Sequence, residues 1–146
     1  MTKTEPIFYL YLQKKSGQTT VVGFAVMGGI FGEGIDLVGN SLTGVAVLGV
    51  GLPGISVEEN LIKQHFDDTI GYGYDYAYVF PGMNRVLQAA GRVIRSENDK
   101  GILLLIDDRY SRPDYQSLMP DSWFPKLIKS EMELDGEIKQ FWGNNE

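Results

Sequence analysis

The fold is decided by the stretch Gly44-Val45-Ala46-Val47-Leu48-Gly49-Val50, an uninterrupted apolar run that Gly51-Leu52-Pro53-Gly54 closes. A continuous apolar run, as opposed to an alternating one, is typical of a strand covered on both faces. Ser56 follows and can cap a helix, because its hydroxyl accepts a backbone N–H and two glutamates stand in the first turn. We expect this helix to continue to Phe66, which gives the strand–loop–helix unit of an α/β fold.

Two more apolar runs have the same character, at residues 21–27 and 102–106. Between them, Pro81 indicates the start of a second helix, which we expect to reach Arg95. Buried strands that alternate with helices predict an α/β domain with a mainly parallel sheet. In such sheets, ligands bind at the loops beyond the carboxyl ends of the strands. Those loops are residues 28–36, 51–54 and 107–109.

The tyrosine-rich segment after the first helix is expected to be extended from Tyr76 to Phe80. The alternating tyrosines in and before it either pack against neighbouring helices or stack on nucleic-acid bases, and packing is favoured. They are Tyr72, Tyr74, Tyr76 and Tyr78.

The two ends of the chain are less regular. Residues 7–12 fit either a strand or, with Thr4 as a cap, the first helix of the chain. A helical stretch is expected from Trp123 to Met132. We therefore expect one domain over residues 1–146, with a core at 17–123 and an acidic helical tail at 124–146.

The composition excludes several classes of protein. The chain has no cysteine and one histidine, so disulfide frameworks, thiolate metal sites and multi-histidine metal centres are excluded. Residues 1–6 lack the apolar region of a signal peptide, and no apolar run reaches the roughly 20 residues that cross a bilayer. We expect a soluble, cytoplasmic protein with no membrane partner. A net charge of -6 argues against a free-standing nucleic-acid binder.

The arginines are nevertheless concentrated, since all five lie between Arg85 and Arg112. At 3.6 residues per turn, a helix over 82–95 places Gln88 and three arginines on one face, opposite an apolar face. Either this is an ordinary solvated face, or the guanidiniums hold a phosphoryl group as its charge develops. The set is Arg85, Gln88, Arg92 and Arg95.

Two motifs resemble those of ATP-dependent DNA helicases of the XPD/DinG group. Gln88-Ala89-Ala90-Gly91-Arg92-Val93-Ile94-Arg95 is similar to their motif VI, Q-x-x-G-R-x-I-R. Phe31-Gly32-Glu33-Gly34-Ile35-Asp36-Leu37 resembles their motif V, with Gly32 where many relatives carry serine. Residues 49–53 and 107–110 also fit the pattern of the group in order and spacing. The resemblance covers residues 17–123.

The resemblance implies a RecA-like three-layer sandwich, here as a partial second motor domain. In such helicases two motor domains bind ATP between them, and single-stranded DNA crosses both. The second domain supplies arginine fingers, which would be Arg92 and Arg95, to ATP and Mg²⁺ held by the first. The other implied site residues are Gln88, Glu33, Asp36 and Gly34 at the nucleotide and Gly28, Gly29 and Arg85 at the DNA.

The sequence lacks the phosphate-binding motif G-x-x-x-x-G-K-[ST]. Asp107 and Asp108 therefore do not serve as a Walker B box, and we expect them to pair with Arg109 or Lys100. We expect the chain alone to bind no cofactor and to hydrolyse no ATP. Missing sheet partners would favour self-association. The alternative is a non-catalytic interaction or nucleic-acid-binding module of the same fold, while a free-standing nucleotide-binding protein is disfavoured.

Overall fold

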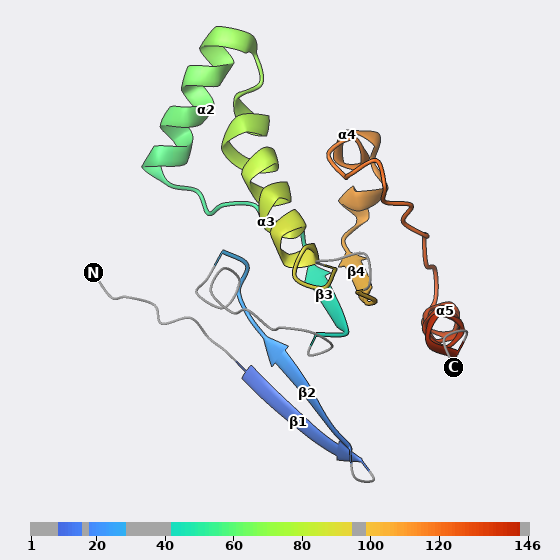
Figure 1. Cartoon of the computed structure of the whole chain (residues 1–146). Helices are drawn as coiled ribbons and strands as arrows, with labels where there is room; N and C mark the ends of the chain where they lie inside the picture. Colours follow the sequence, from blue (N-terminus) through green and yellow to red (C-terminus); the bar gives the residue numbers. More distant parts are fainter. Residues whose placement is uncertain (1–8, 16–17, 29–41, 95–98, 144–146) are drawn as a thin grey trace.

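A computed structural model describes residues 9–15, 18–28, 42–94 and 99–143 (Figure 1). The predicted positions Gly29, Glu33, Gly34, Asp36, Arg95 and Thr4 lie outside these residues. The elements are β1 (Tyr9–Lys15), β2 (Gln18–Phe24), β3 (Gly44–Leu48), α2 (Val57–Ile70), the π-helical turn η1 (Asp75–Val79), α3 (Phe80–Ala90), β4 (Ile102–Ile106), the 3-10 turn η2 (Asp108–Ser111), α4 (Pro113–Gln116) and α5 (Glu131–Gly143).

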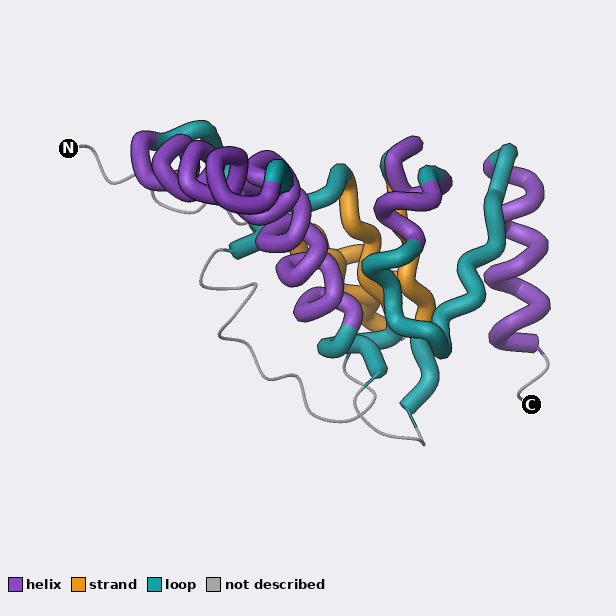
Figure 2. The backbone as a smooth tube through the Cα atoms, turned by 90° about the horizontal axis from the view of Figure 1, so that it is seen from above, coloured by secondary structure: helices purple, strands orange, loops and turns teal. Residues whose placement is uncertain are grey.

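The strands β3 and β4 form a parallel pair, in register from Gly44 opposite Ile102 to Leu48 opposite Ile106. The chain passes from one to the other through α2, η1 and α3, which is the crossover that a parallel pair requires. The predicted α/β class with a parallel sheet is confirmed. Figure 2 shows α2 and α3 on one side of the strands and α5 apart from them, beyond the segment that follows β4.

The first apolar run differs from its prediction. Strand β2 covers residues 18–24 and pairs antiparallel with β1 in a separate two-stranded sheet (Figure 1). Phe24 and Val26 are 57% and 60% exposed, so the expected burial on both faces is wrong. The physical reason is that a hairpin supplies its own backbone partners, whereas burial of both faces needs layers that the described residues do not provide. Of the two predictions for the N-terminal segment, the strand is the correct one.

The core lies between α3 and one face of the β3–β4 pair. Its centre is formed by Val47, Val50, Met83, Val86, Tyr110 and Tyr115. The opposite face of the pair is open, since Leu48 is 71% exposed and Ile106 is 53% exposed. The two strands are therefore covered on one face by the described residues, and the prediction that both faces are buried is wrong for them too.

Helix α2 confirms the predicted N-terminus. The Ser56 hydroxyl accepts the Glu59 N–H at 3.3 Å, and Glu58 and Glu59 stand in the first turn. The helix continues past Phe66 to Ile70 and ends at Gly71, whose φ of 75° is the left-handed conformation that suits a helix end.

The predicted extended segment at Tyr76–Phe80 is wrong, because these residues continue into α3 through the π-helical turn. Pro81 has no N–H to donate to Ala77, and the turn closes instead with the Phe80 N–H on the Asp75 carbonyl. Tyr76 stacks on Phe66 of α2 with ring centroids 4.1 Å apart. This aromatic contact joins α2 to η1 and agrees with the packing interpretation of the tyrosines.

The C-terminal segment also differs from its prediction. Residues 123–129 carry no helix, and α5 begins at Glu131. Pro120 and Pro125 flank Trp123, and a proline removes a backbone donor and restricts the residue before it. No helix in the described part of the chain is long and apolar enough to span a bilayer.

Candidate functional site

Helix α3 begins very close to the loop that follows β3. A Cβ placed on Gly82 would lie 2.6 Å from the Val50 carbonyl oxygen. A Cβ placed on Gly51, whose φ is +64°, would lie 2.9 Å from the Gly82 carbonyl oxygen. Two glycines thus allow two backbones to touch, and they fix the start of α3 above the end of β3.

Arg85 joins this loop to Gly28, which follows β2 in the chain. Its Nη1 donates to the Gly51 carbonyl at 3.1 Å. A Cβ placed on Gly28 would lie 3.1 Å from Arg85 Nε and 3.4 Å from Cζ, so the guanidinium covers Gly28 closely. Gly28 has a φ of +77°, which is a conformation that favours glycine. The structure therefore brings together Gly28 and Arg85, which the sequence assigned to one site.

The loop after β4 is tied to the loop after β3 by a tyrosine. The Tyr110 hydroxyl donates to the Gly49 carbonyl at 2.7 Å, and burial raises the pKa of this hydroxyl to about 12. Gly49 N–H in turn donates to the Ile106 carbonyl at 3.1 Å. These contacts join the loops after β3 and β4, and Arg85 joins the loop after β3 to Gly28.

Asp107 and Arg109 form a two-bond ion pair beside Tyr110. Arg109 Nε and Nη2 donate to the two carboxylate oxygens of Asp107, each at 2.8 Å. These hydrogen bonds hold the pKa of the Asp107 carboxyl well below its usual range. The expectation that these acids pair with Arg109 is confirmed for Asp107, which holds the guanidinium with both carboxylate oxygens.

The polar face of α3 carries Arg85 and Gln88, and the opposite face is buried. Val86 is 0% exposed and Ala90 is 5% exposed. The helix ends at Ala90, so the predicted continuation to Arg95 is wrong. Gly91 supplies no side chain and has low helix propensity, and a tighter turn follows in which the Val93 N–H donates to the Ala90 carbonyl at 3.0 Å.

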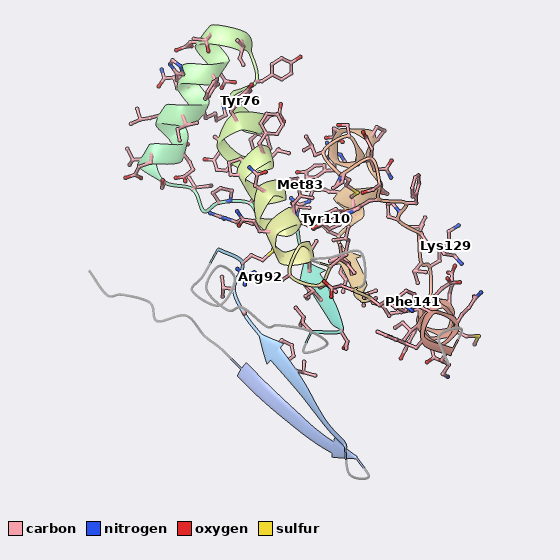
Figure 3. The ribbon with its side chains drawn as sticks, in the orientation of Figure 1. Tyr76, Met83, Arg92, Tyr110, Lys129 and Phe141 are labelled. Carbon is pink, nitrogen blue, oxygen red and sulfur yellow. The ribbon has the colours of Figure 1, made fainter. Side chains whose placement is uncertain are left out.

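Arg92 therefore lies in the turn after α3 and not on its helical face, so the expected single face holds only for Arg85 and Gln88 (Figure 3). Arg92 is half-buried, and its neighbour Val93 is 5% exposed. Val93 is buried and anchors the turn, so Arg92 is held in a defined position just after the end of α3.

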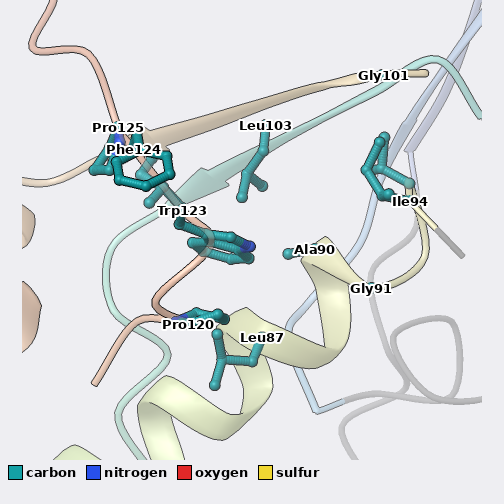
Figure 4. A pocket seen from close by; sticks show the side chains of 12 residues that line it. Leu87, Ala90, Gly91, Ile94, Gly101, Leu103, Pro120, Trp123, Phe124 and Pro125 are labelled. Carbon is teal, nitrogen blue, oxygen red and sulfur yellow. The ribbon is translucent and has the colours of Figure 1, made fainter. Parts of the chain in front are cut away.

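A pocket of about 520 Å³ lies behind α3, on the side away from its polar face (Figure 4). The Trp123 side chain points toward Ala90 of α3, with Leu103 of β4 on one side and Leu87 on the other. The lining side chains are apolar, so this pocket suits hydrocarbon and not phosphate. It does not belong to the site at the strand ends.

The sequence placed Gly51 in a strand-end loop and Tyr110 in a segment that fits the helicase pattern, but it did not identify Gly82 as part of the site. Gly49 and Gly51 have positive φ angles, 81° and 64°, which show a tight turn after β3. The glycine pair after an apolar strand was the available signal, whereas nothing in the sequence paired it with Gly82.

Comparison with known proteins identifies the family. Residues 2–126 match the family model described as helicase C-terminal domain. The chain belongs to this family. The match covers every described element except α5.

The relatives of this helicase C-terminal domain are helicases and a nuclease of the predicted group. It is 33% identical over 117 residues, 77% of the chain, to the 3'-5' exonuclease DinG of Staphylococcus saprophyticus. It is 30% identical over 148 residues, 92% of the chain, to the ATP-dependent DNA helicase CHL1 of Kluyveromyces lactis. It is 31% identical over 107 residues, 71% of the chain, to the XPD helicase subunit of Schizosaccharomyces pombe. The predicted XPD/DinG resemblance is confirmed.

The helicase C-terminal domain covers a small part of these relatives. The chain spans 12% of the DinG protein, 18% of CHL1 and 14% of XPD. The activities that their names give concern much longer proteins.

Proposed function

We propose that this helicase C-terminal domain is the part of a DNA helicase motor that brings arginines to ATP held by a first motor domain. The observation that carries the proposal is the placement of Arg92. It lies in a turn that Val93 anchors in the core, at the end of a helix whose start is fixed on the β3 loop. A cation held in this way costs little reorganisation when charge develops on a phosphoryl group.

Arg92 and Arg95 are the proposed arginine fingers, with Gln88 as a neutral donor one turn before Arg92. Guanidinium groups suit phosphate oxygens, since they present several N–H donors in one plane. Glu33, Gly34 and Asp36 would line the same cleft. ATP with Mg²⁺ would be held by the first motor domain, since the phosphate-binding motif G-x-x-x-x-G-K-[ST] does not occur in this sequence.

Single-stranded DNA is the second proposed partner, at the strand-end loops. Gly28 and Gly29 lack side chains, so their backbone can approach a phosphate or sugar closely. Arg85 covers Gly28 and belongs to the same proposed DNA site. In this proposal the core of the domain is residues 17–123 and residues 124–146 form a separate acidic tail.

Self-association is a further part of this proposal. The uncovered face of the β3–β4 pair carries Leu48 and Ile106, both more than half exposed. Sedimentation velocity over a range of concentrations tests it. We expect dimers that Leu48→Glu disperses, and a monomer at high concentration would contradict the expectation.

The test of the nucleotide role is reconstitution. The chain is mixed with the first motor domain of the same parent protein, and DNA-stimulated ATP hydrolysis is measured for the wild type and for the double variant Arg92→Ala, Arg95→Ala. We expect hydrolysis by the wild-type pair and a loss of about 10³-fold in the variant. Circular dichroism of the variant checks that its fold is intact.

Two outcomes of this test contradict the proposal. Full activity in the double variant would remove the arginines from the mechanism. No activity from a pair that associates stably would favour a non-catalytic interaction module of the same fold.

A further inference from the structure

Arg85 makes contacts that an ordinary solvent-exposed arginine does not make. The side chain is half-buried, and its Nη1 donates to the Gly51 carbonyl at 3.1 Å. Within the described part of the chain, no carboxylate forms an ion pair with it. Among the described residues, the guanidinium donates to a neutral backbone carbonyl in the loop after β3.

The rest of the side chain contacts the same loop and a second one. A Cβ placed on Gly51 would lie 3.5 Å from Arg85 Cβ and 3.4 Å from the Met27 methyl carbon. A Cβ placed on Gly28 would lie within 3.5 Å of Arg85 Nε, Cζ and Cδ. The aliphatic part of the side chain therefore packs on the loop after β3, and the guanidinium packs on Gly28.

We propose that Arg85 is a positioning residue. It clamps two pieces of backbone against α3: Gly28, which follows β2, and the loop after β3. The clamp fixes Gly28, and the motif V segment begins at Phe31, three residues later. Arg85 therefore fixes the position of Gly28, three residues before that motif, relative to α3. The clamp itself follows from the contacts of Arg85. Only its effect on a helicase motor rests on the proposed function.

The chemistry of the clamp requires arginine. A guanidinium is planar and carries several donors, so it can bond Gly51 and cover Gly28 at once. A lysine at position 85 keeps the charge and can reach the Gly51 carbonyl with one N–H, but its ammonium has no plane to lie over Gly28. The two contacts can therefore be separated by substitution.

Hydrogen exchange of the intact chain, followed by mass spectrometry, tests the clamp without nucleotide or DNA. In Arg85→Met we expect exchange to rise about tenfold or more at residues 26–28 and at 49–52, since a charge-assisted hydrogen bond is lost. In Arg85→Lys we expect partial recovery at 49–52 and none at 26–28. Asn84→Ala, at the exposed neighbouring position on the same helix, is the matched control and should change neither segment.

Unchanged exchange at both segments in Arg85→Met would overturn the clamp. An equal rise throughout the chain would also overturn it, because it would show that Arg85 supports the fold as a whole. A positive result would stand even if the reconstituted motor proved inactive, so the two proposals can fail separately.

The salt dependence of single-stranded DNA binding by the reconstituted pair tests the role of the clamp. A residue that positions loops should weaken binding in both Arg85→Lys and Arg85→Met, with the slope against salt nearly unchanged. A direct phosphate contact would instead lower the slope by about one in Arg85→Met and leave Arg85→Lys close to wild type. That second pattern, or no effect of either variant, would contradict the positioning role.

Discussion

Helices α2 and α3 are joined by η1, whose Tyr76 stacks on Phe66 of α2, yet the two helices are stabilised in different ways. Helix α3 buries Gly82, Met83, Val86 and Ala90, while α2 buries no residue. Helix α2 depends on its own caps and on the Lys63–Asp67 ion pair at 2.5 Å. The helix that carries the candidate site is therefore fixed by the core, and its neighbour is held by local interactions.

This difference between α2 and α3 also bears on which cations can be held in place for a bound phosphate. The cations near α3 lie next to buried side chains, as Arg92 does next to Val93. Lys63 of α2 is 42% exposed and is already paired with Asp67. A cation on a rigid element can be held for a reacting phosphate, whereas an exposed one is screened and mobile.

The largest expected effect is in the core of α3. Met83 is 2% exposed, so Met83→Ala should lower the free energy of unfolding by about 2–5 kcal/mol. Leu61→Ala, at a position of α2 that is 63% exposed, should change it by less than about 0.5 kcal/mol. Urea denaturation measures both. An equal loss from Leu61→Ala would show that this face of α2 is buried in solution, for example against a second copy.

The next effect concerns glycines with positive φ. Gly51→Ala should cost about 2–4 kcal/mol, because backbone strain adds to a Cβ only 2.9 Å from the Gly82 carbonyl oxygen. Gly71→Ala at the end of α2 has the same strain with nothing within 4 Å, and should cost about 1–2 kcal/mol. Thermal unfolding compares them. Similar losses would mean that the close approach of α3 to the β3 loop does not exist.

Tyr110→Phe should cost about 1–1.5 kcal/mol, since the hydroxyl donates to the Gly49 carbonyl at 2.7 Å. The pH dependence follows from its raised pKa of about 12 against about 10 in the unfolded chain. The folded state binds this proton more tightly, so the contribution is complete below pH 10 and is lost as the pH rises toward 12. The difference in stability between wild type and variant, measured from pH 8 to 12, should shrink over this window and not before it.

The smallest effect is at the cap of α2. Ser56→Ala removes the hydroxyl that accepts the Glu59 N–H, and should cost about 0.5–1 kcal/mol. Helix content by circular dichroism and the unfolding midpoint measure it. Ser56→Asp, which keeps a capping oxygen, is the matched control and should restore stability.

The sequence predicted the features that depend on local chemistry. Ser56 with its glutamates fixed the start of α2, and the apolar runs fixed β3 and β4, because each signal lies within a few residues. Asp107 and Arg109 are two positions apart and could pair without any long-range contact. The motif VI and motif V resemblances gave the family, which residues 2–126 then confirmed.

The predictions that were wrong concern places where long-range packing overrides the local sequence pattern. Position 91 was read as part of a helix because the arginine spacing fitted one, but a glycine at this point lets Val93 turn into the core. The π-helical turn before Pro81 was missed because a period of two in the tyrosines imitates a strand. The pairing of Gly51 with Gly82 joins residues far apart in sequence, and no local pattern announces it.

The central claim is that α3 and its terminal turn, and not α2, act on ATP. The measurement that tests it most directly is the kcat of DNA-stimulated ATP hydrolysis by the reconstituted pair with Arg92→Ala and with Lys63→Ala. We expect kcat to fall about 10³-fold for Arg92→Ala and to change by less than about twofold for Lys63→Ala. Wild-type turnover in a folded Arg92→Ala variant, or equal losses from the two substitutions, would contradict it.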